Sequence, residues 1–88
     1  YDTVFPASHA FQTPWREAET LRGPGVADMK GGIAVMLAAL EAFEQLPGDK
    51  HVGYEVLLSP DEEIGSPASA VLLAELGKRA HLGMTYEP

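Results

Sequence analysis

The segment from residue 29 to residue 46 most constrains the fold, because its apolar side chains recur at helical spacing and cover most of its circumference. The periodic positions are Ile33, Met36, Leu37, Leu40 and Phe43. Asp28 stands where a helix N-cap is expected, and Pro47 ends the helix. A helix that is apolar on most sides needs cover from several neighbouring elements, so the sequence predicts that this one is largely buried.

Short runs of β-branched and aromatic residues alternate with the helical segments. Residues 51–59 and 82–86 are typical of strands, and residues 1–5 of the end of another strand. A second helix is expected from Ser66, as its N-cap, to Gly77. The order strand, loop, helix, strand, helix, strand predicts an α/β fold with parallel strands joined by right-handed crossovers.

The connection from residue 6 to residue 19 is long for a compact domain and lacks clear periodicity. Residues 19–22 are typical of one arm of a short hairpin, and the run Gly23-Pro24-Gly25 forces a turn before the first helix. The aromatic side chains of this connection, together with Phe5, are expected to anchor it on the end of the sheet.

The 88 residues include 6 Lys and Arg against 13 Asp and Glu, which gives a formal net charge of −7. A chain of this length folded alone would bury only about 60–65% of its unfolded surface, so a core is marginal. Nucleic acids and anionic membranes need clustered basic residues, so the charge argues against both and favours a cation. The chain has no cysteine, so a metal would be held by oxygen and imidazole. Because Tyr1 already belongs to an extended segment, we expect an excerpt of a longer protein, whose compartment stays open with the cytoplasm favoured.

The run Asp61-Glu62-Glu63 places three carboxylates directly after an apolar segment, where their repulsion needs compensation. A solvated acidic turn is one interpretation, and a cation site is the other. Ligands bind outside the carboxyl ends of parallel strands, and Asp2, Asp28 and Glu87 are expected at that rim. A two-metal hydrolase needs such a set, because one carboxylate bridges two cations about 3.5–4 Å apart and others complete each metal. One further carboxylate must stay off the metals to take a proton from water.

Four stretches of the chain resemble, in order, the motifs of the dizinc peptidase and deacylase family. That family includes glutamate carboxypeptidase, acetylornithine deacetylase, succinyl-diaminopimelate desuccinylase and aminoacylase. The stretches are residues 2–6 (DTVFP), 23–32 (GPGVADMKGG), 59–66 (SPDEEIGS) and 87–88 (EP). The resemblance spans nearly all of the chain, and the spacings between its acidic residues are similar to those of the glutamate carboxypeptidase branch.

The resemblance implies a role for each acid. Asp28 would be the bridging metal ligand, Glu63 a ligand of one metal and Glu87 a ligand of the other. Glu62 would be the general base. Asp2 would orient a metal-binding histidine two residues earlier, which lies before Tyr1. A second histidine ligand would lie downstream of Pro88, so the chain would hold three of the five protein ligands.

The resemblance also implies a fold, a cofactor and a reaction. Residues 1–88 would form the central part of a zinc-exopeptidase-like catalytic domain, with a three-layer, mostly parallel sheet and flanking helices, and with its N- and C-terminal portions missing. Two Zn²⁺ ions, with Co²⁺ or Mn²⁺ as alternatives, would serve hydrolysis of an amide near a free carboxylate, by a carboxypeptidase or an N-acyl amino acid deacylase. The substrate would be a small molecule or peptide, the partners would include neither nucleic acid nor membrane, and a homodimer stays open. The 88 residues alone are expected to be inactive.

Two alternatives compete with this hypothesis. Nucleotide binding is suggested by the glycines at residues 23–25, but Asp28 stands where a dinucleotide fingerprint needs a small residue, and Met29 where a P-loop needs glycine. A non-catalytic α/β module that has lost its metals is the second alternative, and the presence of every acid expected in this span favours catalysis over it. His9 is expected to be a solvated loop histidine rather than a ligand.

Overall fold

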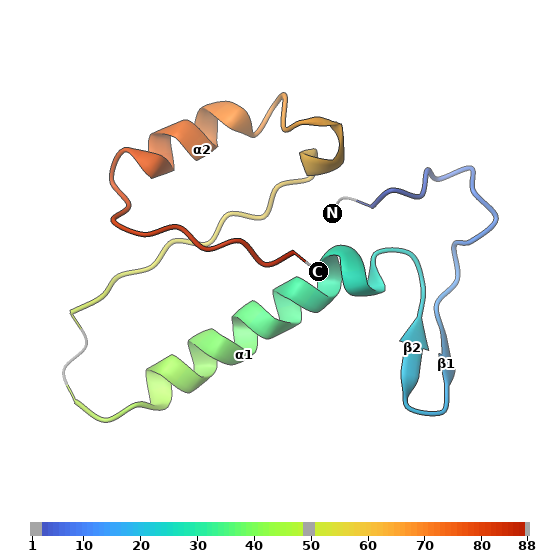
Figure 1. Ribbon diagram of the computed structural model, residues 1–88, viewed down its shortest axis with the longest axis horizontal. Helices are drawn as coiled ribbons and strands as arrows, with labels where there is room; N and C mark the ends of the chain where they lie inside the picture. Colours follow the sequence, from blue (N-terminus) through green and yellow to red (C-terminus); the bar gives the residue numbers. More distant parts are fainter. Residues whose placement is uncertain (1–2, 49–50, 88) are drawn as a thin grey trace.

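The computed structural model describes residues 3–48 and 51–87. The elements along the chain are the strands β1 (Trp15–Glu17) and β2 (Thr20–Arg22), an irregular helical turn η1 (Val26–Gly31), helix α1 (Gly32–Gln45), a short 3-10 turn η2 (Glu62–Ile64) and helix α2 (Ala70–Gly77). Figure 1 shows the hairpin at one end of the molecule and two extended segments running between the two helices.

The strands β1 and β2 pair antiparallel, with Trp15 opposite Arg22. Ala18 lies in the tight turn between them with φ 51, the left-handed conformation that short hairpin turns require. Arg22 also forms an ion pair with Glu17 at 3.0 Å, but both side chains are exposed, so the pair contributes at most about 1 kcal/mol. The hairpin arm predicted at residues 19–22 is confirmed.

Aromatic side chains of the N-terminal connection stack on one another. The ring centroids of Phe5 and Phe11 are 5.0 Å apart and those of Phe11 and Trp15 are 5.5 Å apart, both edge to face. His9 lies against Phe5 at 5.1 Å, and its Nδ1 accepts a hydrogen bond from the Phe11 backbone N–H. These rings therefore form a cluster of their own, and their anchoring on the end of the predicted sheet stays a prediction, because the described sheet consists of β1 and β2 alone.

Helix α1 confirms most of the helix predicted over residues 29–46. The N-cap predicted at Asp28 is wrong, because Asp28 lies inside η1 with φ −94° and ψ 106°, and regular helix begins only after Gly31. At the other end Leu46 is extended, with ψ 138°. That conformation follows from Pro47, since a proline disfavours helical angles in the residue before it.

Helix α2 starts later than the sequence predicts and ends at Gly77 as predicted. Ser66 is not its N-cap, because Ser66 has φ 54° and its N–H donates to the backbone oxygen of Asp61 at 2.8 Å. The chain therefore closes a loop at Ser66, and the helix begins only at Ala70.

The strands predicted at residues 51–59 and 82–86 are not formed in the part of the chain that the structure describes, and residues 3–5 are not a strand either. A strand is defined by a ladder of hydrogen bonds to a neighbour, and the described sheet consists of β1 and β2 alone. Residues 51–59 and 82–86 therefore run as extended chain, and both segments lie between the two helices (Figure 1).

Apolar side chains from both helices and both extended segments line one groove of about 1330 Å³. Its helical lining includes Ile33, Met36, Leu40 and Phe43 of α1, and Leu73 and Leu76 of α2. Leu37 lies outside it and is 57% exposed. No apolar side chain within residues 3–48 and 51–87 is fully buried, so the predicted burial of the first helix is wrong for this chain by itself. Its radius of gyration of 16.0 Å exceeds the roughly 12 Å of a compact chain of this length.

No helix in the described ranges is both long and apolar enough to cross a membrane.

Candidate active site

Two acidic side chains from distant parts of the sequence lie within electrostatic range of a third near the start of α1. Glu87 is close enough to Asp28 and Glu62 for the negative charges of both to raise its pKa, after the larger effect of lost hydration. A side-chain hydrogen bond with Asp28 raises the pKa of Glu87 further. The structure therefore brings together the end of one extended segment, the turn η1 and the turn η2.

Asp28 is placed by the shape of η1. The turn opens at Gly25, which is buried and has φ 67°, a conformation that favours glycine. The Lys30 N–H then donates to the Gly25 carbonyl oxygen at 2.9 Å, and the peptide bond between Asp28 and Met29 is cis. The Lys30 ammonium donates to the Pro24 carbonyl oxygen at 3.2 Å. Asp28 is thus held on a closed turn by the glycine-rich motif that precedes the helix.

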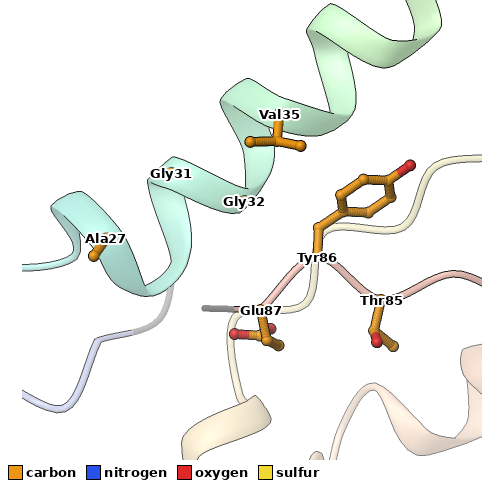
Figure 2. Close-up of a pocket in the computed structure, with 7 residues that line it drawn as sticks. All are labelled: Ala27, Gly31, Gly32, Val35, Thr85, Tyr86 and Glu87. Carbon is orange, nitrogen blue, oxygen red and sulfur yellow. The ribbon is translucent and has the colours of Figure 1, made fainter.

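Glu87 is placed by a close approach between α1 and the segment that ends in Tyr86 and Glu87. Figure 2 shows this segment passing the start of α1, with the Tyr86 ring beside Val35, around a small pocket of about 360 Å³. A Cβ atom on Gly32 would overlap the Tyr86 carbonyl oxygen and lie 2.8 Å from the carbonyl carbon. Only glycine at position 32 permits this approach, which brings Glu87 to Asp28.

Glu62 and Glu63 lie in η2, and both are solvent-exposed. The loop around them is closed by two backbone hydrogen bonds of 2.8 Å, from Gly65 N–H to the Glu62 oxygen and from Ser66 N–H to the Asp61 oxygen. Gly65 has φ 87°, so glycine is required at the end of the turn. The bend that separates the two glutamates from α2 is therefore built into the backbone.

Asp61 has a role that the sequence did not reveal. Its carboxylate accepts hydrogen bonds from the side chain of Ser69, from that of Ser59 at 2.8 Å, and from the N–H groups of Ala68 and Ser69 at 2.7 and 3.1 Å. Donation by Ser69 is the largest influence, and together these donors lower the pKa of Asp61 to about 2 against the opposing effect of burial. Asp61 is thus a fixed anion inside the fold. The available signal was an aspartate in the loop that leads into a helix.

The acids predicted from the sequence therefore divide by position. Glu87 interacts electrostatically with Asp28 and with Glu62, and Glu63 lies next to Glu62 in η2. Asp2 lies outside the described residues. Among the residues that are described, no group of three or more histidine, cysteine, aspartate or glutamate side chains is arranged to hold a metal. The repulsion that raises the pKa of Glu87 nevertheless fits a site that a cation would complete together with further ligands.

A model of peptidase family M20/M25/M40 matches residues 1–87. The chain belongs to this family. It is 36% identical to carboxypeptidase G2 of Pseudomonas sp. (strain RS-16) over 88 residues, which cover 99% of this chain and 21% of the relative. It is 40% identical to the succinyl-diaminopimelate desuccinylase of Stenotrophomonas maltophilia (strain R551-3) over 86 residues, which cover 93% of this chain and 23% of the relative. No solved structure gives a significant match.

Membership of the M20/M25/M40 family confirms the resemblance on which the sequence hypothesis depends. It implies the α/β peptidase fold, and enzymes of this family are generally metal-dependent, typically with zinc. The chain spans about a fifth of the length of the curated relatives it matches.

We predict that Gly32→Ala lowers the free energy of unfolding of the intact protein. The added Cβ must push α1 away from Tyr86. Overpacking of this kind typically lowers the free energy of unfolding by about 1–3 kcal/mol. Gly77→Ala is the matched control, because a Cβ there meets nothing within 4 Å, and its effect should stay within about 1 kcal/mol. Chemical denaturation measures both, and equal stability of the two variants would contradict the close approach.

We predict that Glu87→Gln stabilises the intact protein once metal has been removed by a chelator. The raised pKa of Glu87 means that the folded state disfavours its ionised form, so stability falls as pH rises from the ordinary glutamate pKa through the raised one. The variant should therefore gain most in unfolding midpoint at neutral pH and lose the gain below about pH 4. A gain that is independent of pH would show that the charges of Asp28 and Glu62 are not its cause.

Proposed function

We propose that the intact protein is a metal-dependent amide hydrolase, either a carboxypeptidase or an N-acyl amino acid deacylase. The observation that carries this proposal is the setting of Glu87, whose pKa is raised by lost hydration and then by the nearby charges of Asp28 and Glu62. Negative charges that disfavour the ionised form of a neighbouring carboxylate are unfavourable without a cation and useful with one. The family match over residues 1–87 supports the same reaction class.

The proposed cofactor is a pair of Zn²⁺ ions, which Co²⁺ or Mn²⁺ could replace because the ligands are mostly oxygen. Asp28 would bridge the two ions, while Glu63 and Glu87 would each bind one. Asp2 would orient a histidine ligand outside this chain. When bound, the ions would polarise the substrate carbonyl and make water a stronger acid.

Glu62 is the proposed general base. Its exposed position in η2 leaves its carboxylate accessible to solvent, and it lies close enough to Glu87 for their charges to interact. A Glu62 carboxylate oxygen would take a proton from the attacking water and return a proton to the leaving amine nitrogen. Asp61 is unsuited to this task, because hydrogen bonds from the surrounding donors occupy its carboxylate.

The proposed substrates are small molecules or peptides with a free carboxylate near the amide bond. One relative is named a carboxypeptidase and the other a desuccinylase, and both names describe cleavage of an amide close to a carboxylate. Residues 1–88 would then form the central part of the catalytic domain, within a three-layer, mostly parallel sheet with flanking helices. Neither nucleic acid nor membrane is a proposed partner, and a homodimer of the intact protein is compatible with the proposal.

We predict that Glu62→Gln in the intact protein retains about two metals per chain and lowers kcat by about 10²- to 10⁴-fold, the usual contribution of a general base. Gln keeps the size of the side chain but cannot accept the proton. Metal content by atomic emission and turnover of an N-acyl amino acid and of a peptide with C-terminal glutamate measure the two effects.

The matched control is Glu55→Gln, which removes the same charge from the extended segment that leads to η2. Glu55 pairs with Arg79 at 2.9 Å on the surface, so its loss should leave kcat unchanged and cost at most about 1 kcal/mol. Substantial residual activity of Glu62→Gln would show that Glu62 is not the general base. A wild-type protein that binds metal and hydrolyses neither substrate would favour the non-catalytic alternative.

We predict that the 88-residue chain by itself binds zinc weakly and hydrolyses nothing. Its described residues contain no complete metal-binding group and no fully buried apolar side chain. Calorimetric titration with zinc should show no tight stoichiometric binding, whereas the intact protein should bind about two ions. Tight binding by the isolated chain would show that it supplies a complete site.

A further inference from the structure

We propose that Asp61 is a positioning residue, whose carboxylate fastens the turn that carries Glu62 and Glu63 to the start of α2. This inference rests on the proposed function, because it concerns where those two side chains are held. It assigns a task to the one member of the acidic run that the reaction itself does not use.

The contacts of Asp61 come from both sides of the turn. On the upstream side the Ser59 hydroxyl donates to Oδ1 at 2.8 Å. On the downstream side the N–H groups of Ala68 and Ser69 donate to Oδ2, and the Ser69 hydroxyl donates to Oδ1. One carboxylate therefore ties the chain before the turn to the chain after it.

Burial separates Asp61 from its two acidic neighbours. Asp61 is 8% exposed and Ser69 is 9% exposed, and these are the buried polar residues of the described part of the chain. Glu62 and Glu63 are exposed. A buried carboxylate requires its hydrogen-bond partners, so removing it leaves four donors without their acceptor. The backbone at this point is consequently fixed more firmly than an exposed acidic turn would be.

The fixed point lies immediately before the functional side chains. The carbonyl oxygen of Asp61 also accepts the Ser66 N–H at 2.8 Å, so the side chain and the main chain of Asp61 both hold the loop. Glu62 starts η2 directly after this residue. Release of the Asp61 carboxylate would therefore move the start of η2 relative to Asp28 and Glu87, which belong to other segments.

A helix-capping role alone and a positioning role predict different results. Capping alone would cost stability and leave the chemistry intact. Positioning predicts that metal affinity and kcat fall by more than the loss of stability explains. Residues that orient metal ligands typically change metal affinity or activity by about 10- to 100-fold when they are replaced.

The test compares Asp61→Ala and Asp61→Asn with Leu76→Ala in the intact protein. Leu76 lies in α2 and lines the apolar groove, so its truncation destabilises the same helix without touching the carboxylate. Zn²⁺ affinity by competition with a chelator, kcat, KM and the unfolding midpoint are measured for each. We expect Asp61→Ala to lose about 10- to 100-fold in Zn²⁺ affinity and in kcat with a small change in KM, and Asp61→Asn to recover part of both. Leu76→Ala should lose stability only.

Retention of wild-type Zn²⁺ affinity and kcat by Asp61→Ala, with a loss of stability like that of Leu76→Ala, would overturn the inference. If Asp61→Ala does not fold, the double variant Ser59→Ala/Ser69→Ala removes the two hydroxyl donors and keeps the carboxylate. That variant should lower kcat by about 2- to 10-fold, and an unchanged kcat would also overturn the inference. Wild-type turnover and Glu62→Gln measured in parallel separate this failure from failure of the proposed function, because only the latter predicts an inactive wild type or full turnover in Glu62→Gln.

Discussion

The contact between Gly32 and the backbone of Tyr86 is the constraint on which the arrangement of the site depends. Without a side chain at position 32, the start of α1 can lie against the backbone of Tyr86, the residue before Glu87. The same end of α1 continues from η1, which carries Asp28. One close backbone approach therefore sets the separation between two acids that lie far apart in the sequence. Steric fit brings these charges together, and their electrostatic interaction follows from that fit.

The structure gives carboxylates of one chain opposite electrostatic surroundings. Asp61 is surrounded by hydroxyl and amide donors, which stabilise its ionised form and lower its pKa to about 2. Glu87 has lost hydration and faces Asp28 and Glu62, so its ionised form is destabilised and its pKa is raised. The fold thus satisfies the charge of Asp61 internally and leaves the charge at Glu87 to be satisfied from outside. A cation is the partner that this second environment favours.

The sequence predicted the parts of the fold that depend on local chemistry. The apolar periodicity predicted α1, and most of its periodic side chains line the groove. Pro47 predicted the end of this helix, and residues 19–22 predicted one arm of the hairpin. The start of each helix was misplaced because the backbone angles at Asp28 and Ser66 come from loop closure, which local preference does not reveal. Strands at residues 51–59 and 82–86 require hydrogen-bonded neighbours, so their pattern predicted their path and not their pairing. The proximity of Glu87 to Asp28 and Glu62 was predictable as a shared rim, whereas the Gly32 contact that brings Glu87 to Asp28 was not.

In the run Asp61-Glu62-Glu63, burial distinguishes the first of three adjacent carboxylates from the other two. A strand that ended in three equivalent exposed acids would have no fixed geometry, because each carboxylate would be free to rotate and repel its neighbours. Asp61 is buried among four hydrogen-bond donors, which compensate its charge. Its carboxylate therefore holds the loop in place. The bend at Gly65 then separates the two remaining glutamates from α2. Order at the first acid is therefore the physical condition for the different roles proposed for the second and the third.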